Sequence, residues 1–241
     1  MIVIENVSKS FKTKKVLEQV SLTVRRGEVI GLLGENGAGK TTLLRMLSTV
    51  LAPTEGTITV AGFDTVRQQL EVRRRIGILF GGETGLYNRL TARENIYYFG
   101  QLYEIPRARL DENVSRLVHY FGLDAFLDKR VGEFSKGMRQ KVAIARSIIH
   151  DPDIILLDEP TSGLDVTSAF GMRNLIGDMK TRGKTIVFSS HIMEEVKKLC
   201  DRVVMIHHGK VKFDGPLEPL FAEREMEDLE HIFMNMIGED K

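Results

Sequence analysis

Apolar and polar positions alternate in short blocks along the first part of the chain. Residues 2–4 and 21–24 are rich in β-branched side chains and lie between charged turns, so they predict two antiparallel strands. Residues 29–33 are uniformly apolar, as in a buried strand, and lead into a glycine-rich loop. Apolar side chains then recur at helical spacing over residues 41–47, which predicts a helix directly after the loop.

The pattern changes to a helical period in the middle of the chain. Residues 58–60 and 75–80 still indicate strands, whereas residues 91–126 follow a helical spacing that Pro106 and Gly122 interrupt. The last third mixes both element types, with strands predicted at 154–157, 185–188 and 202–206 and helices at 166–181 and 193–199. Buried strands separated by helices are typical of parallel sheets. We therefore expect an α/β fold with a mostly parallel sheet, an N-terminal antiparallel β subdomain and an inserted helical subdomain.

Charge and cysteine content narrow the class of protein. The 34 Lys and Arg residues against 33 Asp and Glu leave a formal charge of +1, and we expect no nucleic-acid partner. The single cysteine, Cys200, excludes an internal disulfide or a multi-cysteine zinc site and fits a reducing cytosol. No apolar run approaches the roughly 20 residues that cross a bilayer, and the start of the chain does not resemble a secretory signal.

One glycine-rich stretch carries a phosphate-binding pattern. Residues 34–41, Gly-Glu-Asn-Gly-Ala-Gly-Lys-Thr, match GxxxxGK[ST] between the predicted buried strand and the predicted helix. The glycines let backbone N–H groups turn toward phosphates, and the helix start adds the positive end of its dipole. Lys40 would supply charge to the β and γ phosphates, and Thr41 a hydroxyl to Mg²⁺. The alternative is a glycine turn with a surface lysine, which leaves the flanking strand and helix unexplained.

Further polar residues follow predicted strands. Asp158 and Glu159 end a buried strand, where two carboxylates need a cation or a catalytic task; a plain turn is the alternative. In a phosphate-loop enzyme Asp158 would hold Mg²⁺ and Glu159 would orient the attacking water. His191 ends another strand, where it could reach the γ-phosphate or serve as a core or capping residue. We interpret His207 and His208 as a hairpin turn rather than a metal site.

Residues 134–141, Phe-Ser-Lys-Gly-Met-Arg-Gln-Lys, resemble the signature of the ATP-binding cassette. With the phosphate loop, the stretch 158–165 and His191, four motifs stand in the order and at the spacing of that family over almost the whole chain. The chain is therefore similar to the ATPase subunits of ABC transporters, which implies ATP hydrolysis on a phosphate-loop (RecA-like) core. We expect a single ABC ATPase domain over 1–241, with the core at 1–82 and 151–217, the helical subdomain at 83–150 and a helical tail at 218–241.

The resemblance implies roles for individual residues. Glu159 would be the general base, His191 the γ-phosphate sensor, and Lys40 a catalytic cation. Thr41 and Asp158 would hold Mg²⁺. Residues 162–165 would form the loop between paired sites. ATP would be bound by Phe11 at the adenine ring and by Gly34, Asn36, Gly37, Ala38, Gly39, Lys40, Thr41, Thr42, Ser135 and Gly137.

The same resemblance implies partners. Ser135 and Gly137, at a predicted helix N-terminus, form an anion site that the chain's own phosphate loop cannot easily use. A second ATPase subunit, most simply another copy of this chain, would therefore sandwich two ATP molecules in a head-to-tail pair. The ATPase would drive a transmembrane permease on a separate chain, an exporter, and would be cytoplasmic, peripheral on the inner face of the cell membrane through that permease.

Two departures from the family pattern stand out. Residues 81–83, Gly-Gly-Glu, replace the usual Gln after the strand at 75–80, so that metal ligand is absent or supplied by Glu83. Lys136 replaces a signature glycine, and its side chain either points away from the nucleotide or adds positive charge to it. Together with Gly85-Leu86-Tyr87, the stretch from Phe80 is most similar to sodium-efflux ABC exporters.

Other phosphate-loop proteins fit less well. Soluble ABC ATPases of DNA maintenance or translation would show long insertions or two cassettes, a kinase would lack the signature, and a GTPase would contain Asn-Lys-x-Asp.

We expect Leu86 and Tyr87, beside the atypical loop, to form the surface that docks the permease. The alternative is that this apolar pair belongs to the core of the helical subdomain.

Overall fold

The computed structural model describes residues 1–80 and 85–217, and two sheets organise this part of the chain. The larger sheet has six strands in the order β10-β9-β3-β8-β7-β6. Its strands are β3 (Val29–Leu33), β6 (Ile76–Leu79), β7 (Ile154–Asp158), β8 (Thr185–Ser190), β9 (Arg202–His207) and β10 (Lys210–Pro216). Neighbouring strands are parallel except for the β9–β10 hairpin, which confirms the predicted parallel sheet and the hairpin turn at His207 and His208.

The smaller sheet is antiparallel, with the order β2-β1-β4-β5. Its strands are β1 (Ile2–Phe11), β2 (Lys14–Val24), β4 (Glu55–Val60) and β5 (Phe63–Asp64). Ile2 pairs with Val24 and Ile4 with Leu22, which confirms the predicted pairing and extends both strands to a hairpin turn. The short β5 has no counterpart among the predicted elements, because two residues are too few for a visible period.

Seven α-helices are described in residues 1–80 and 85–217. They are α1 (Lys40–Leu47), α2 (Gln69–Arg73), α3 (Ala92–Leu102), α4 (Arg107–Phe121), α5 (Lys136–Ser147), α6 (Val166–Thr181) and α7 (Met193–Leu199). The predicted helical stretch 91–126 is divided where Pro106 precedes α4, and α4 ends at Gly122 in a left-handed conformation. The capping box of Thr91 and Glu94 starts α3, since each side chain accepts from the other residue's N–H.

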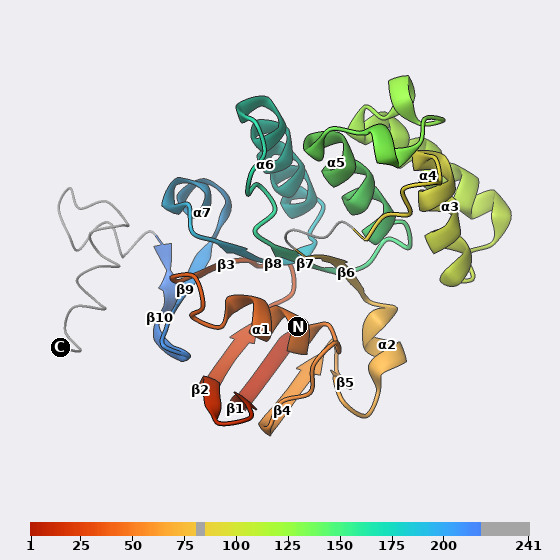
Figure 1. The fold of residues 1–241 in the computed structure, drawn as a ribbon. Coiled ribbons are helices and arrows are strands. Elements are labelled where there is room, and N and C mark those ends of the chain that lie inside the picture. The colour runs from red at the N-terminus through yellow and green to blue at the C-terminus, as the bar shows by residue number, and fades with distance from the viewer. Residues whose placement is uncertain (81–84, 218–241) are drawn as a thin grey trace.

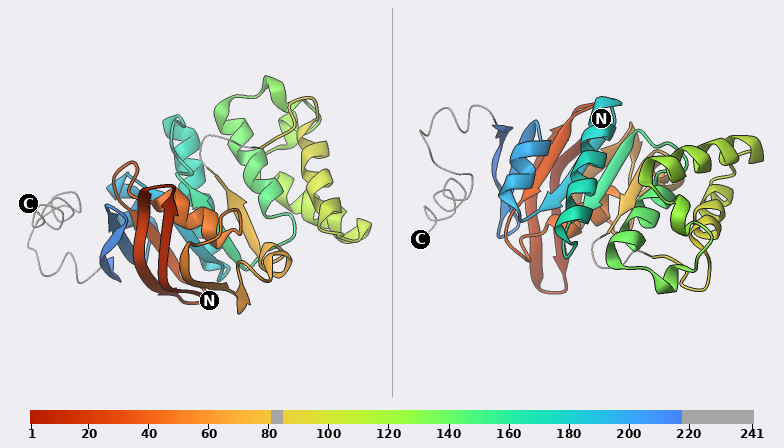
Figure 2. Two further views of the ribbon diagram at one scale, coloured as in Figure 1. Left: turned by 60° about the horizontal axis from the view of Figure 1, so that its bottom comes forward. Right: turned by 90° about the horizontal axis from the view of Figure 1, so that it is seen from above.

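The two sheets and the helices stack in layers (Figure 1). Helix α1 lies between the two sheets, with Leu43, Leu44 and Met46 buried against both. Helices α6 and α7 cover the opposite face of the large sheet, and α3, α4 and α5 gather at its β6 end (Figure 2). One core runs from strand residues such as Leu79 and Ile155 into these three helices. The α/β class with an antiparallel part is therefore as predicted; the exact domain boundaries stay a prediction, and the predicted tail at 218–241 lies outside the described residues.

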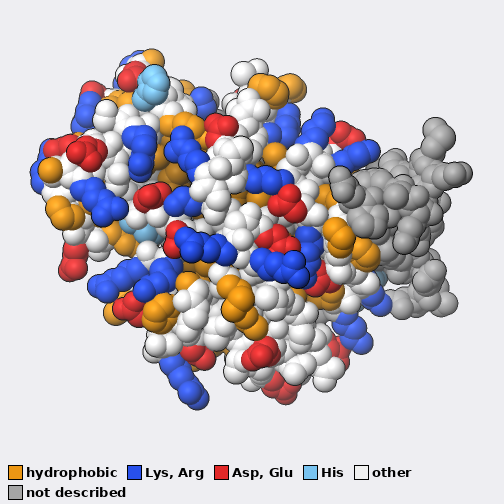
Figure 3. Space-filling view, turned by 180° about the vertical axis from the view of Figure 1, so that it is seen from behind, with side chains coloured by type: hydrophobic (Ala, Val, Ile, Leu, Met, Phe, Trp, Pro, Cys, Tyr) orange, Lys and Arg blue, Asp and Glu red, His pale blue; other side chains and the backbone are white. Residues whose placement is uncertain are grey.

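The face of the molecule shown in Figure 3 has no single dominant charge. Basic and acidic side chains are interspersed over the face shown in Figure 3, in keeping with a formal net charge of +1. Within the part of the chain that the structure describes, no helix is long and apolar enough to cross a bilayer.

Candidate active site

The phosphate loop joins the buried strand β3 to the start of α1, as the sequence predicts. Gly39 caps the helix at φ +113°, where a Cβ would lie 2.6 Å from Leu17 Cδ2 and 3.0 Å from the Val16 carbonyl oxygen. Only glycine fits this close approach of the loop to β2. The backbone is therefore held in the open curve that lets N–H groups face an anion.

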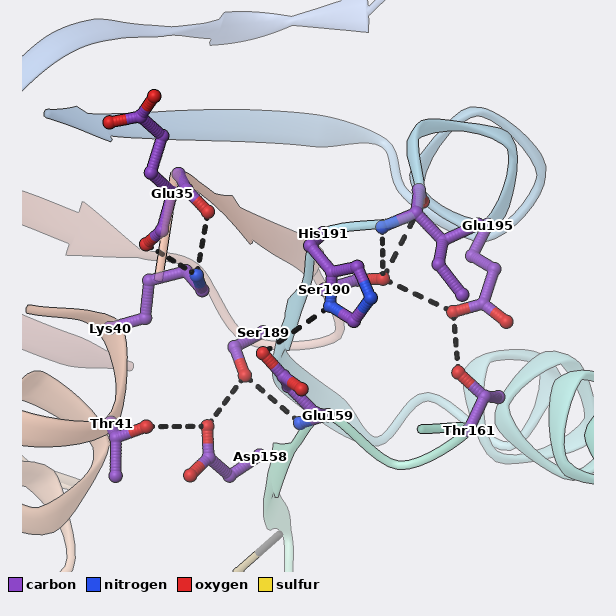
Figure 4. Close-up of polar contacts among 12 residues, drawn as sticks. Glu35, Lys40, Thr41, Asp158, Glu159, Thr161, Ser189, Ser190, His191 and Glu195 are labelled. Carbon is purple, nitrogen blue, oxygen red and sulfur yellow. Dashed lines mark hydrogen bonds and ion pairs between the residues drawn. The ribbon is translucent and has the colours of Figure 1, made fainter. Parts of the chain in front are cut away.

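Lys40 lies inside this loop, with its side chain 5 % exposed. Its Nζ donates to the carbonyl oxygens of Gly34 at 2.6 Å and Glu35 at 3.1 Å (Figure 4). Burial lowers the pKa of this ammonium, and the carboxylates of Glu159 and Asp158 oppose that shift. Two backbone carbonyls thus hold the Lys40 ammonium at the loop, and a bound phosphate could take their place as its hydrogen-bond acceptor.

Asp158 and Thr41 meet across the edge of the large sheet. Asp158 ends β7, is 5 % exposed, and its Oδ1 accepts from Thr41 Oγ1 at 3.1 Å. The same Oδ1 accepts from Ser189 Oγ at 2.7 Å, because Asp158 and Ser189 are register partners on the parallel strands β7 and β8. A hydroxyl and a carboxylate at this spacing fit a hard cation that completes its shell with phosphate oxygens and water.

Glu159 is held in an unusual backbone conformation. Its φ is +47°, which costs a residue with a Cβ of order 1 kcal/mol and is common at functional sites. The Glu159 N–H donates to the Ser189 carbonyl at 3.2 Å and to Ser189 Oγ at 3.0 Å, and these bonds fix the turn. The side chain is directed back to His191, whose Nδ1 lies 3.4 Å from Glu159 Oε1. Both side chains retain exposure, 26 % for Glu159 and 50 % for His191.

Comparison with known proteins agrees with this geometry. The family model for ABC transporters matches residues 17–162. The chain belongs to the ABC transporter family. This ABC ATPase is 56 % identical over 241 residues to the ABC transporter ATP-binding protein NatA of Bacillus subtilis (strain 168), covering 98 % of each chain. It is 37 % identical over 217 residues to the Nod factor export ATP-binding protein I of Rhizobium sp. (strain N33), covering 90 % of this chain and 71 % of that one.

A solved structure shares the fold of this ABC ATPase. The dimeric post-hydrolysis state of the ATP-binding cassette MJ0796, bound to ADP and Pi, superposes with a TM-score of 0.81 at 27 % identity, covering 90 % of this chain and 99 % of that one. The phosphate-loop core and the ATPase class that the motifs predict are thereby confirmed. The chain is an ATP-binding subunit of an ABC transporter.

The signature residues of this ABC ATPase lie where α5 begins beside α6. Ser135 caps α5, and its Oγ accepts from the Met138 N–H at 3.3 Å. A Cβ on Gly137 would lie 2.4 Å from Ser168 Oγ of α6, so glycine lets the two helices approach closely here. Lys136, which is exposed, folds its ammonium onto Gly163 of the same chain, a residue at φ +67°. The signature therefore contacts the loop at 162–165 within one chain.

The remaining predicted ATP-site residues are distributed around the loop. Phe11 ends β1 and is 44 % exposed, and its ring centroid lies 5.1 Å from Lys9 Nζ. It belongs to the β1–β2 hairpin, whose second strand contacts Gly39 of the phosphate loop. Asn36 is exposed and Ala38 is buried at the turn before α1, and Thr42 lies in α1 itself. Glu83, the predicted replacement metal ligand, lies outside the described residues.

Leu86 and Tyr87 differ in a way that the sequence does not reveal. The expectation of an exposed pair is wrong for Leu86, which is 9 % exposed and belongs to the same core as Ile96 and Leu110. Tyr87 is 48 % exposed, and its ring packs edge-on against Tyr98 at 5.3 Å. The side chain of Asn95 holds the backbone at Tyr87, because its Oδ1 accepts from the Tyr87 N–H at 2.8 Å and its Nδ2 donates to the Tyr87 carbonyl at 3.2 Å.

Sequence reading missed Ser189, which contacts both acids of the site. The available signal was two hydroxyl residues directly before His191, at the end of a strand predicted to neighbour the acidic one. It also missed Glu195, whose buried carboxylate accepts hydrogen bonds from Thr161 and Ser190. No motif spacing indicates that contact, because Glu195 reads as one more acid on a charged helix.

Proposed function

We propose that this ABC ATPase binds Mg·ATP at the carboxyl end of the large sheet and hydrolyses it to drive an exporter. The observation that carries the proposal is the convergence of a buried ammonium, a hydroxyl–carboxylate pair and a partly exposed carboxylate at one sheet edge. Lys40 would neutralise the β and γ phosphates, and Glu159, beside His191, would orient the water that attacks the γ-phosphate. His191 would contact that phosphate as a sensor.

Thr41 and Asp158 would hold Mg²⁺ in this proposal. Magnesium prefers oxygen ligands and is commonly bound by one or two carboxylates together with substrate phosphates, which matches this pair at 3.1 Å. The bound cation would neutralise charge on the phosphates during transfer. Ser189 would keep Asp158 in the orientation that presents a free carboxylate oxygen.

We propose a head-to-tail dimer as the active assembly. The α5 N-terminus carries no acidic residue in its first turn, and Lys136 adds a cation there, so this end of the helix is suited to bind the γ-phosphate of ATP held by a second subunit. The similar cassette MJ0796 is dimeric in its structure with ADP and Pi. A homodimer would close two such sites by one two-fold operation.

We propose a separate permease as partner and export as the direction of transport. The similarity to NatA and to a Nod factor export ATPase supports this, and the resemblance to sodium-efflux exporters favours sodium as the substrate. A groove of about 580 Å³ lies between the large sheet and α3 and reaches Gly85, two residues before Tyr87; its other lining side chains include Arg45, Phe80, Phe99, Tyr103 and Arg146. The permease would dock there and hold the ATPase at the inner face of the membrane.

Glu159→Gln tests the proposed function. The amide keeps the size of the side chain but loses the basic oxygen, so we expect parental ATP affinity, turnover reduced at least hundredfold, and an ATP-bound dimer in size-exclusion chromatography. Glu112→Gln, at an exposed position of α4, is the control and should behave as the parent. Parental turnover in Glu159→Gln would remove this residue from the role of general base.

A further inference from the structure

A buried carboxylate lies behind the two reactive side chains without touching either. Glu195, in the first turn of α7, is 3 % exposed. Its Oε2 accepts from Thr161 Oγ1 at 2.7 Å and from Ser190 Oγ at 3.2 Å (Figure 4). Its Oε1 forms an ion pair with Arg173 Nη1 of α6 at 3.2 Å. A carboxylate this far from water is retained only where such partners replace its hydration.

The two hydroxyl partners belong to the two loops that carry the reactive groups. Thr161 follows Glu159 by two residues, and the Ser162 N–H closes the intervening turn on the Glu159 carbonyl at 3.1 Å. Ser190 directly precedes His191, and its Oγ also accepts from the Ile192 N–H at 3.0 Å. One carboxylate oxygen therefore joins the Glu159 loop, defined as residues 159–162, to the His191 loop, defined as residues 190–192.

The direct contact between the reactive side chains is weaker than this link. His191 Nδ1 and Glu159 Oε1 are 3.4 Å apart and both side chains reach solvent. In contrast, Thr161 and Ser190 are 6 % and 3 % exposed, and their bonds to Glu195 are charge-assisted. Glu195, a residue of neither loop, therefore adds a buried link between them beside the bonds that Glu159 makes to Ser189 on the neighbouring strand.

We propose that Glu195 is a positioning residue that fixes the separation of the Glu159 loop and the His191 loop for ATP hydrolysis. The proposal rests on the proposed function, since it assigns Glu195 an effect through Glu159 and His191. Glu195 does not contact the phosphate loop in any hydrogen bond of the described residues, so its effect falls on turnover rather than on ATP binding.

The first test compares Glu195→Gln with Glu194→Gln in the 241-residue chain. Glu194 is the neighbouring acid of the same helix, with a side chain 71 % exposed and paired with Lys198 at the surface, which makes it a matched control. We expect kcat for ATP hydrolysis to fall about tenfold in Glu195→Gln, with ATP affinity within twofold of the parent, and Glu194→Gln to leave both parental. A parental kcat in Glu195→Gln overturns the proposal.

The second test separates positioning from a purely structural role. Glu195→Gln leaves Arg173 facing a neutral partner and should lower the melting temperature, which Arg173→Met in addition should restore by removing the unpaired charge. On our proposal kcat stays low in this double variant, because the charge-assisted bonds to Thr161 and Ser190 remain weakened. If kcat recovers together with the melting temperature, Glu195 is structural only.

Variants of the two hydroxyl partners, Thr161 and Ser190, provide a third test of the role of Glu195. Thr161→Val and Ser190→Ala each remove one arm of the link, and we expect their effects on kcat to be non-additive when combined. Additive effects would count against a shared link. Glu159→Gln is measured beside them: parental turnover there overturns both proposals, whereas parental turnover in Glu195→Gln overturns only this one.

Discussion

Ser189 Oγ lies 2.7 Å from Asp158 Oδ1, and it is the hydroxyl of Ser189 that donates. Ser189 Oγ also accepts a hydrogen bond from the Glu159 N–H at 3.0 Å. One buried hydroxyl therefore orients the carboxylate proposed to hold Mg²⁺ and fixes the left-handed turn that carries the proposed general base. This arrangement follows from the register of β7 and β8, in which Asp158 and Ser189 are direct partners.

Ser189→Ala should therefore impair turnover and metal use together. Asp158 would lose a donor and the Glu159 N–H one of its acceptors, so we expect kcat to fall about tenfold and half-maximal activity to need several-fold more Mg²⁺. Steady-state ATPase assays over a magnesium titration measure both. Ser147→Ala is the control, because its buried hydroxyl bonds to the Ile144 carbonyl of its own helix. An unchanged magnesium requirement in Ser189→Ala would contradict the orienting role.

Local patterns were sufficient for most of the fold. The uniform apolar runs identified β3, β7, β8 and β9, because a strand buried on both faces leaves no polar positions. The phosphate loop and the two acids at the end of β7 were also visible, since each motif consists of specific residue types at a short, fixed spacing. The short α2 was not predicted, because five residues hold too little of a helical period to register.

What the sequence could not predict depends on contacts between distant segments. Glu195 meets Thr161 across 34 positions of the chain, and Leu86 belongs to a core that includes residues of helices that follow it, such as Ile96. The sequence left open whether the Lys136 side chain points away from the nucleotide or adds positive charge to it. In the structure its ammonium lies against Gly163 of the same chain. Each of these depends on how the helices pack on the sheet, which residue type and spacing do not specify.

Lys40→Ala tests the phosphate loop directly. Removal of the ammonium leaves the β and γ phosphates with backbone N–H groups alone, so we expect ATP affinity to fall at least hundredfold. Binding of a fluorescent ATP analogue measures the effect. Lys184→Ala, a lysine that pairs with Asp151 in a surface loop, serves as control and should bind as the parent does. Nucleotide affinity unchanged in Lys40→Ala would reject the phosphate-loop assignment.

Tyr87 and Leu86 allow a matched test of the docking surface, because they are adjacent and differ in burial. Tyr87→Glu places a charge where the side chain already meets water, so the melting temperature should stay parental while association with the permease is lost. Leu86→Glu buries a charge in the core and should lower the melting temperature by 10 °C or more, a shift of roughly 3 kcal/mol or greater. Co-purification with the membrane partner and thermal unfolding provide the two measurements. Retained association in a folded Tyr87→Glu variant would place the docking surface elsewhere.

His150 gives the protein a pH-dependent contribution to stability. Its ring stacks on Tyr103 with centroids 3.8 Å apart, and its Nε2–H donates to the Ile76 carbonyl at 3.1 Å. Burial lowers the pKa of this imidazole from 6.5 to about 4, and the hydrogen bond to Ile76 only partly opposes the shift. The folded protein therefore holds His150 neutral at a pH where the unfolded chain protonates it.

We expect the free energy of unfolding to fall as the pH drops from 6.5 to about 4, since unfolding takes up a proton at His150 over that range. The contribution is complete above pH 6.5 and is lost progressively toward the folded-state pKa, with a slope of at most about 1.4 kcal/mol per pH unit. Urea unfolding at a series of pH values measures it. His150→Gln retains a donor for the Ile76 carbonyl but cannot titrate, so its stability should decline less steeply with acid than the parent's. His119→Gln, at an exposed position of α4, should follow the parent. Equal slopes for parent and His150→Gln would show that acid destabilisation arises at other groups.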